Sequence, residues 1–434
     1  MDKVGAASAA TPVDASLARG RQLLVLRIAQ YGLGFIGGVI IARALGPDGR
    51  AAYALPLNLA GLVLVSIHLS VELAVARLVS RGEATFHELA RVGVTAGIVL
   101  GAIGTGLALA IGLPLRDEIL GGASATAVAL AAATIAPSIA GLVTAALLFR
   151  RGVLLRYGFV QAGQGLLQLG LLAALVLHAG LTPETTLAIN LGVTSASTVA
   201  LMVLLRIDLG AGSLRPSTDR QLLGRVFRAG IVLHASSLAL FLNLRLDLLL
   251  VGAILDERRA GIYSLAVTLA ELGIVATTTL SLAALKDQTE FAEDDAAEFT
   301  AAFARRTLRW AVLYAIVASA VSYPFVRLAY GAEWTDAVVP FVLLTVGVVA
   351  LSIEAPARGL LLRIGRPWTV SAAAACGLVA NIAINLALLR PLGLAGAAIA
   401  SIASYWVVAA LMVLLVRRAR RTRPPRPMQP LSST

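Results

Sequence analysis

The chain has 434 residues, of which 58% are hydrophobic and 14% are charged, and its formal net charge at pH 7 is +12. A soluble domain carries about 25% charged residues, so this composition excludes a soluble enzyme, a nucleic-acid-binding domain and a disordered protein. The mean hydropathy of +0.86 indicates a chain that lies mostly within a membrane.

The hydrophobic pattern predicts twelve transmembrane helices, because a helix needs about 20 apolar residues to cross a bilayer. Breaks rich in Gly and Pro, such as Gly46-Pro47 and Arg390-Pro391, separate successive runs. The apolar run that follows residues 1–16 is longer than the core of a signal peptide, so we expect an uncleaved signal anchor. The predicted spans are 22–45, 51–78, 90–113, 123–149, 157–179, 185–206, 229–255, 260–285, 308–330, 337–362, 368–389 and 394–416.

The distribution of basic residues predicts that both termini are cytoplasmic. With the N-terminus inside, 27 of the 36 basic residues fall in inner segments and 7 in outer loops, Arg50 among them. Cytoplasmic loops carry the excess of Lys and Arg in membrane proteins. We therefore expect a multi-pass protein of the cytoplasmic (inner) membrane, and the same bias accounts for the net charge without nucleic acid.

An internal repeat relates the two halves of the chain at a spacing of 210 residues. The matching positions are Leu45, Tyr53, Leu55 and Leu62 with Leu255, Tyr263, Leu265 and Leu272, and the segment 200–205 with 410–415. Six spans in each half give both halves the same orientation, which predicts a parallel repeat around a central cavity with alternating access. The predicted divisions are a six-helix bundle at 1–206, a cytoplasmic linker at 207–228, a second six-helix bundle at 229–416 and a basic cytoplasmic tail at 417–434.

Two arginines lie within predicted spans, where a charge at the bilayer centre costs roughly 2.5–3.5 kcal/mol. Arg245 is deep in the seventh span, whereas Arg27 is near the inner end of the first and either extends to the membrane surface or binds phosphate. Because a guanidinium binds phosphate oxygens in a bidentate manner, both are candidate substrate ligands. Gln161, Gln164 and Gln168 share one face of the fifth span and suit either sugar hydroxyls or interhelical hydrogen bonds.

Three carboxylates within spans are candidates for coupling transport to an ion or a proton. Asp247 lies two residues after Arg245 and points to nearly the opposite side of the helix. Two interpretations stay open: at least one of the two residues is functional, or they form structural ion pairs with another helix. Glu271 is alone in the eighth span, which fits ion coupling or a structural partner equally. Glu72 lies four residues from His68, which could carry a proton or serve as a hydrogen-bonded core residue.

A further pair of charges, Glu354 and Arg358, lies on the tenth span. They are four residues apart and can pair on one helix face, while Pro356 between them is expected to kink the helix. We interpret them as a structural pair.

The remaining motifs favour neither catalysis nor a cofactor. Neither of the two lysines follows a glycine, as a P-loop requires, and the single Cys376 can form no intrachain disulfide or Cys-rich metal site. His87-Glu88 begins like a zinc-protease helix, but Arg91 occupies the position of the second histidine. We therefore expect no enzyme, no metal and no cofactor.

Three segments resemble polysaccharide-biosynthesis flippases of the multidrug/oligosaccharidyl-lipid/polysaccharide (MOP) exporter superfamily. The sequence Ile-Ala-Arg-Ala-Leu-Gly-Pro-Asp-Gly-Arg-Ala-Ala-Tyr-Ala-Leu at 41–55 is similar to their first hairpin. The stretch from Asp247 to Gly252, followed by Ala260-Gly261-Ile262-Tyr263, is similar to the counterpart on helix seven, and 393–400 to the start of the last helix. The resemblance implies a MATE-like, all-α polytopic fold.

The function implied by this resemblance is export of an undecaprenyl-pyrophosphate-linked oligosaccharide from the inner to the outer leaflet, for polysaccharides such as exopolysaccharide or O-antigen. The expected partners are membrane lipids, the lipid-linked glycan and a coupling H+ or Na+. Two alternatives stay open: a multidrug cation antiporter of the same superfamily, which embedded arginines disfavour, and a flippase for a lipid-linked peptidoglycan precursor. Short external loops disfavour a glycan ligase or polymerase.

Overall fold

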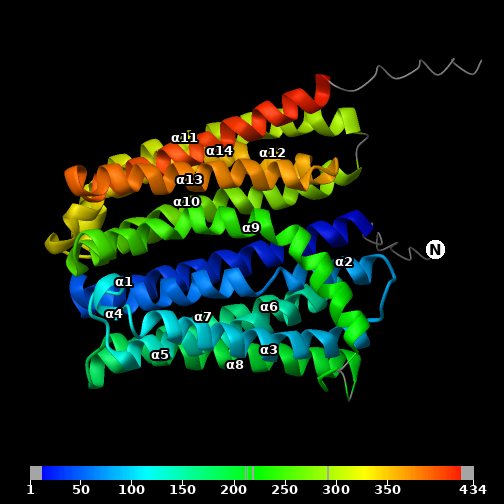
Figure 1. Cartoon of the computed structure of the whole chain (residues 1–434), viewed down its shortest axis with the longest axis horizontal. Coiled ribbons are helices and arrows are strands. Elements are labelled where there is room, and N and C mark those ends of the chain that lie inside the picture. Colours follow the sequence, from blue (N-terminus) through cyan, green and yellow to red (C-terminus); the bar gives the residue numbers. More distant parts are fainter. Residues whose placement is uncertain (1–11, 211, 213, 218, 291–292, 422–434) are drawn as a thin grey trace, which may run out of the picture. The chain divides into compact units, whose positions relative to one another are not determined.

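The computed structural model describes residues 12–421 apart from 211, 213, 218 and 291–292, and it describes side chains from residue 30 onward, apart from 275–296 and several single positions. All regular structure in this part of the chain is helical (Figure 1). The helices are α1 (Pro12–Ile67), α2 (Val71–Ser80), α3 (Phe86–Gly112), α4 (Arg116–Ile119), α5 (Ala125–Ala133), α6 (Ile135–Arg150), α7 (Leu154–His178), α8 (Pro183–Leu209), α9 (Arg220–Ile254), α10 (Glu257–Glu290), α11 (Glu293–Ala329), the 3-10 helix η1 (Ala332–Ala337), α12 (Val338–Arg363), α13 (Pro367–Leu392) and α14 (Leu394–Arg421).

Ten stretches among the described residues are long and apolar enough to cross a membrane. The first, Gln30–Val79, covers two predicted spans, and the eighth predicted span lies in α10, which runs into positions whose side chains are outside the described part. The prediction of an all-α, multi-pass membrane protein is therefore confirmed. Most of the predicted tail at 417–434 and the side chain of Arg27 lie outside the described residues.

Local sequence signals explain where three of the helices begin. The Thr85 side chain accepts a hydrogen bond from the backbone N–H of Glu88, and the Glu88 carboxylate accepts one from the backbone of Thr85, which is a capping box for α3. Thr182 caps α8 in a similar way. Asp219 accepts from two backbone N–H groups at the start of α9, so α9 begins at Arg220, inside the segment 207–228 that the sequence suggested as a linker.

The break predicted at Gly46-Pro47 lies inside α1. Gly46 has φ 66° and ψ −179°, a conformation that only glycine adopts readily, and the helix resumes after it. A second break was not predicted: the apolar run expected to continue from 51 to 78 is interrupted between Ile67 and Val71, where Leu69 and Ser70 both have φ 48°.

The chain divides into two compact units. Unit 1 comprises residues 1–234, 248–265 and 327–334, and unit 2 comprises 235–247, 266–326 and 335–434. Unit 1 therefore includes two short segments, 248–265 and 327–334, that the sequence-based division placed in the second bundle. Helix α9 contributes to both units, and His234 is its last residue in unit 1 before the chain enters unit 2.

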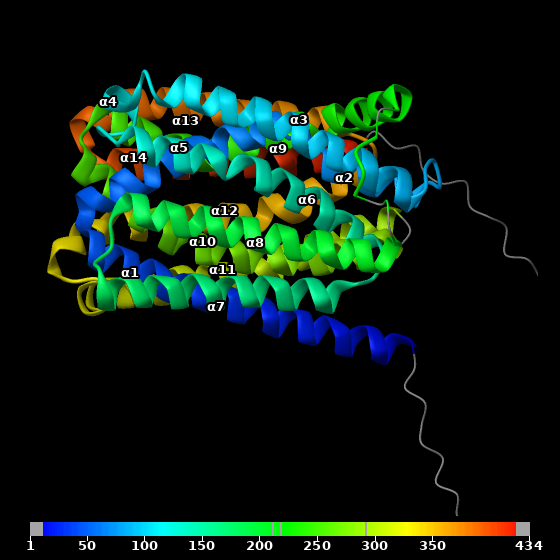
Figure 2. The same cartoon turned by 90° about the horizontal axis from the view of Figure 1, so that it is seen from below.

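Unit 1 is held together by close helix packing, in which α7 lies alongside α1 and α3 alongside α6 (Figure 2). The glycines Gly93, Gly97 and Gly101 recur every fourth residue along α3 and face α6. A Cβ built on Gly101 would lie 2.8 Å from the backbone of Ala136. Small residues at this spacing allow two helix backbones to approach closely, as is common within membranes.

In unit 2, α14 packs against both α12 and α13. Glycines again allow the approach: a Cβ on Gly347 would lie 2.7 Å from the Tyr405 ring, and one on Gly377 would overlap Val408. A core cluster of Ala357, Leu361, Val370, Ala373, Val408 and Met412 fills the space between the three helices.

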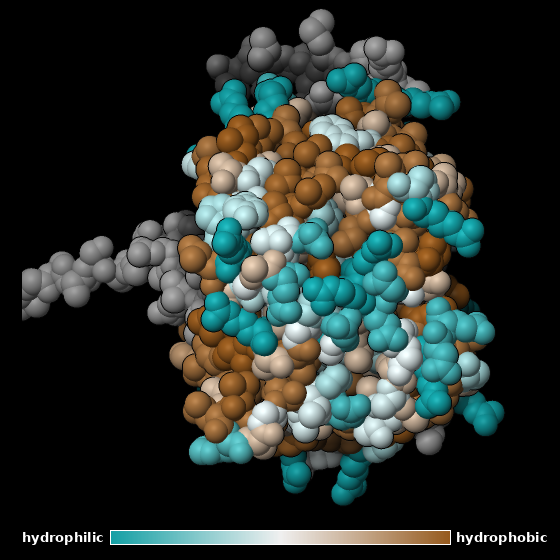
Figure 3. All heavy atoms as spheres, turned by 90° about the vertical axis from the view of Figure 1, so that its left-hand side faces the viewer, coloured by the Kyte–Doolittle hydropathy of each residue, from teal (hydrophilic) through white to brown (hydrophobic). Residues whose placement is uncertain are grey.

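Figure 3 shows hydrophilic side chains gathered where helices end, with hydrophobic ones along the margins of that face.

We expect Gly261→Ala to destabilise unit 1. Gly261, at the start of α10, packs directly on the backbone carbonyl of Pro47, so an added methyl group overlaps that oxygen. Overpacking of this kind costs about 1–3 kcal/mol, which should lower the thermal midpoint of the protein in detergent, measured by fluorescence-detected size exclusion. Gly106→Ala is the control, because nothing lies within 4 Å of that position. Equal midpoints for the two variants would contradict the prediction.

Candidate functional site

A cavity of about 200 Å³ lies within unit 2 and contains three of the residues singled out from the sequence. Arg245 and Asp247 reach it from α9 and Glu271 from α10. Its other lining residues are apolar or aromatic: Phe241, Leu244, Val267, Ala270, Ile274, Leu344, Val348 and Tyr405. A mostly apolar cavity with a few converging polar groups is typical of a ligand site.

Arg245 and Glu271 form an ion pair at the wall of this cavity. Nη1 of Arg245 lies 2.7 Å from Oε1 of Glu271, and the two side chains are 34% and 32% exposed. The ring of Phe241, one turn earlier on α9, lies 6.0 Å from the guanidinium carbon, which adds a cation–π contact. The pair neutralises both charges within the membrane, and its partial exposure keeps the guanidinium accessible from the cavity.

Asp247 has a different environment from Arg245. It is 1% exposed, and its Oδ2 accepts a hydrogen bond from the hydroxyl of Ser401 on α14 at 2.9 Å. Residues two apart on a helix point in widely different directions, so α9 presents Arg245 toward α10 and Asp247 toward α14.

A set of buried polar side chains on α13 and α14 was missed in the sequence. Asn381 donates to the hydroxyl of Ser404 at 3.3 Å, and Asn385 donates to the side-chain oxygen of Asn381 at 2.9 Å. The Oδ1 atoms of Asn385 and of Asn243 on α9 are buried without a hydrogen-bond partner within the described residues. The signal available in the sequence was a pair of neutral amides four residues apart in an apolar span. Polar groups are rare in such spans because burying them without a hydrogen-bond partner is costly.

The glutamines predicted on the fifth span lie in unit 1. Gln161 and Gln164 line a cavity of about 250 Å³ between α6, α7 and α8, together with the hydroxyls of Ser197 and Thr198. Ser197 donates a hydrogen bond to Oε1 of Gln161 at 3.2 Å. Gln168 is half-buried and is not among the residues that line this cavity.

Two further pairs were predicted from spacing. Arg358 Nε lies 2.8 Å from Glu354 Oε1, and Glu354 is 3% exposed, so the pair is formed on one face of α12. In unit 1, Glu72 Oε1 lies 3.6 Å from Nε2 of His68. Glu72 therefore belongs to a cluster with histidines and not to the cavity that holds Arg245.

Arg50, which the sequence placed in an outer loop, is buried in unit 1. Its Nε donates to the hydroxyl of Ser264 at 2.8 Å, and its guanidinium carbon lies 5.9 Å from the centre of the Trp334 ring. No short-range pattern could predict these contacts, since Ser264 lies 214 residues further along the chain.

Comparisons with known proteins extend over most of the chain. Residues 20–285 match the sequence model of a family described as polysaccharide biosynthesis protein. No curated protein sequence gives a significant match.

Solved structures share the fold at low sequence identity. An inward-facing multidrug resistance MATE family transporter of the MOP superfamily is 18% identical, with a TM-score of 0.68 over 91% of this chain and 96% of that one. The lipid II flippase MurJ in an inward closed conformation is 13% identical, with a TM-score of 0.65 over 91% and 87%. A MOP superfamily transporter from Pyrococcus furiosus, described as having a binding pocket of reverse polarity, is 15% identical, with a TM-score of 0.63 over 92% and 93%.

Proposed function

Because the chain belongs to the polysaccharide biosynthesis protein family, we propose that it is a flippase that moves an undecaprenyl-pyrophosphate-linked oligosaccharide across the cytoplasmic membrane. The glycan would be carried from the inner to the outer leaflet for polysaccharide export, with both termini of the protein in the cytoplasm. The fold shared with MOP-superfamily transporters supports a transport role over catalysis.

The observation that carries the proposal is the placement of Arg245 in a membrane-embedded cavity. Its guanidinium offers five N–H donors in a planar fork, which suits the oxygens of a pyrophosphate. The carboxylate of Glu271 lies 2.7 Å from this guanidinium and pairs with it as an anion. We infer that the pyrophosphate displaces Glu271 from Arg245, so that the cavity exchanges one anion for another without leaving an uncompensated charge.

The lining of the second cavity supports recognition of the glycan. Gln161, Gln164 and the hydroxyls beside them present both donors and acceptors, and sugar hydroxyls need both. Arg27, on α1, is a further candidate for phosphate on grounds of sequence alone.

Asp247 is our candidate for ion coupling. A carboxylate beside a hydroxyl, with Asn243 one turn away on the same helix face, supplies the oxygen ligands that hard cations prefer. The buried amide oxygen of Asn243, which has no hydrogen-bond partner within the described residues, favours Na+ over H+, because a proton would satisfy only the carboxylate. Glu271 would contribute indirectly, through its release from Arg245.

A complementation experiment tests the proposed function. Expressed in a strain that lacks its own lipid-linked oligosaccharide flippase, the chain should restore surface polysaccharide, measured by immunoblotting against an empty vector. The peptidoglycan alternative is tested in parallel in a strain depleted of its peptidoglycan-precursor flippase, scored by growth. Rescue of growth without rescue of surface polysaccharide would replace the proposed substrate with the peptidoglycan precursor.

A further inference from the structure

The unpredicted break between α1 and α2 has an unusual backbone. Leu69 and Ser70 both have φ 48°, in the left-handed region that residues other than glycine rarely occupy. The end of α1 also leaves backbone carbonyls without helical partners, and inside a membrane such groups need other donors. The break is therefore maintained by the side chains around it.

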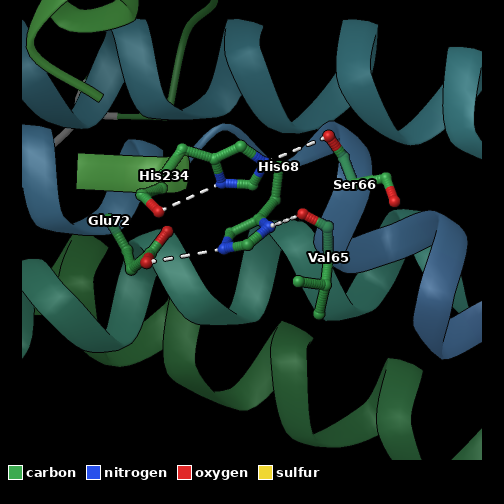
Figure 4. Close-up of polar contacts among 6 residues, drawn as sticks. Val65, Ser66, His68, Glu72 and His234 are labelled. Carbon is green, nitrogen blue, oxygen red and sulfur yellow. Dashed lines mark hydrogen bonds and ion pairs between the residues drawn. The ribbon is translucent and has the colours of Figure 1, made fainter. Parts of the chain in front are cut away.

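Two histidines supply those donors, His68 from within the break and His234 from α9 (Figure 4). His68 Nδ1 lies 2.8 Å from the carbonyl oxygen of Val65, and His234 Nε2, on α9, lies 3.2 Å from that of Ser66. A carbonyl can only accept, so each of these two nitrogens carries its hydrogen. The other nitrogen of each ring, Nε2 of His68 and Nδ1 of His234, is left as the atom that takes up a proton.

The surroundings of these two nitrogens differ. Nε2 of His68 faces Oε1 of Glu72 at 3.6 Å, whereas Nδ1 of His234 faces the hydroxyl of Ser70 at 3.3 Å. If His68 is neutral and Glu72 is ionised, two lone pairs face each other, and a proton between them turns this contact into an attraction. The ring centres are 5.2 Å apart, so protonating both histidines would place two positive charges close together. The cluster is therefore built for one proton, shared by His68 and Glu72.

Among the elements packed around the break, α9 carries two arginines close to Gly230. Both donate to carbonyls outside the cluster: Arg225 to that of Glu83 and Arg228 to that of Gly224. Glu72 on α2 and His234 on α9 are the titratable groups that interact with His68 within the described residues. Helices α3 and α6, which pack against α2, carry their charged or titratable residues only near their ends: His87, Glu88, Arg91 and Arg150. The Glu72 side chain is 19% exposed and that of His68 is 9% exposed, so the carboxylate is the more accessible member of the pair.

We propose that His68, Glu72 and His234 form a proton-binding site that controls how the α1–α2 break packs against α9. A proton from water bonds to Nε2 of His68, the resulting imidazolium pairs with the carboxylate of Glu72, and no other bond forms or breaks. The site is separate from Asp247, which lies in unit 2.

Backbone contact connects this site to α9. Gly230 packs on the carbonyl of Leu69 so closely that a Cβ would overlap the oxygen. A movement of the backbone at the break would therefore also move α9. Eleven residues beyond His234, the same helix carries Arg245. A proton at the break thus acts on the helix that holds the proposed phosphate ligand; this link to transport, unlike the proton site, rests on the proposed function.

Hydrogen–deuterium exchange of the purified protein in detergent tests the site without any substrate. Peptides covering 62–74 and 224–236 are followed at about pH 5.5 and pH 8, with labelling times scaled for the intrinsic exchange rate. In the wild type we expect at least about threefold stronger protection at the lower pH. His68→Gln and Glu72→Gln should each show equal protection at both pH values. His178→Gln, which changes an exposed histidine at the end of α7, should behave like the wild type.

Equal protection of the wild type at both pH values would overturn the proposal, as would a pH difference that survives in His68→Gln. If His68→Gln does not fold, Glu72→Gln decides by the same criterion. Surface-polysaccharide export at the two external pH values then tests the link to transport: the pH dependence should disappear in His68→Gln, and its full retention there would overturn the link. Absence of export by the wild type would instead contradict the proposed function, while the exchange result still decides the proton site.

Discussion

Arg245→Ala should abolish export of surface polysaccharide, with a reduction of at least about 100-fold, equivalent to about 2.8 kcal/mol. The substitution removes the proposed pyrophosphate ligand and leaves the carboxylate of Glu271 in the membrane without its partner at 2.7 Å. Truncating one member of a hydrogen-bonded charge pair commonly has effects of this size. The measurement is surface polysaccharide in a flippase-deficient strain that expresses each variant at a matched membrane level.

Two further variants separate binding of substrate from neutralisation of Glu271. Arg245→Lys keeps the charge but loses the planar fork, so it should retain part of the export. The double variant Arg245→Ala with Glu271→Ala removes both charges and should remain inactive if Arg245 binds the pyrophosphate. Restoration of export by the double variant would show that Arg245 serves only to neutralise Glu271.

Asp247→Asn should reduce export by about 30-fold, equivalent to about 2 kcal/mol, and should remove a stabilising effect of Na+. The asparagine keeps the size of the side chain and can still bond to Ser401, but it removes the negative charge that a bound cation requires. Because a ligand that binds the folded state stabilises it, NaCl should raise the thermal midpoint of the wild type above that in KCl or choline chloride. This difference should vanish in Asp247→Asn.

Asp208→Asn provides the matched control for this experiment. Asp208 pairs with Arg151 at 2.6 Å near the end of α8 and lies outside both cavities. Its substitution should leave the effect of Na+ on the midpoint unchanged. A wild type whose midpoint is the same in all three salts would contradict Na+ binding and favour H+ at Asp247.

The features that could be predicted from sequence are those encoded within one helix. Lengths of apolar runs and breaks such as Gly46-Pro47 predict spans because the bilayer sets the length of each helix. Charges within spans are conspicuous for the same reason, and Arg245, Asp247 and Glu271 do line one cavity. The pairing of Arg245 with Glu271 could not be predicted, because the spacing of residues within each helix does not indicate which faces of two helices are in contact.

The features that were missed depend on contacts between helices. No glycine or proline marks the break at Leu69 and Ser70, and the histidines that contact its carbonyls come from the break itself and from α9. The amides of Asn381 and Asn385 carry no charge, so a search for embedded charges passes over them. Arg50 lies beside a predicted turn and looks exposed, yet its partners come from far along the chain.

The burial of Arg50 sets the order in which parts of the protein can fold. Its hydrogen-bond partner Ser264 is made 214 residues after it, and Trp334, whose ring lies 5.9 Å from the guanidinium, is made later still. A ribosome that has completed residues 1–206 has therefore produced six spans whose buried arginine still lacks both of these partners. Unit 1 reaches its final packing only after η1 has been translated and inserted. Until then, the first half of the nascent chain remains in the membrane without a segment that the second half supplies.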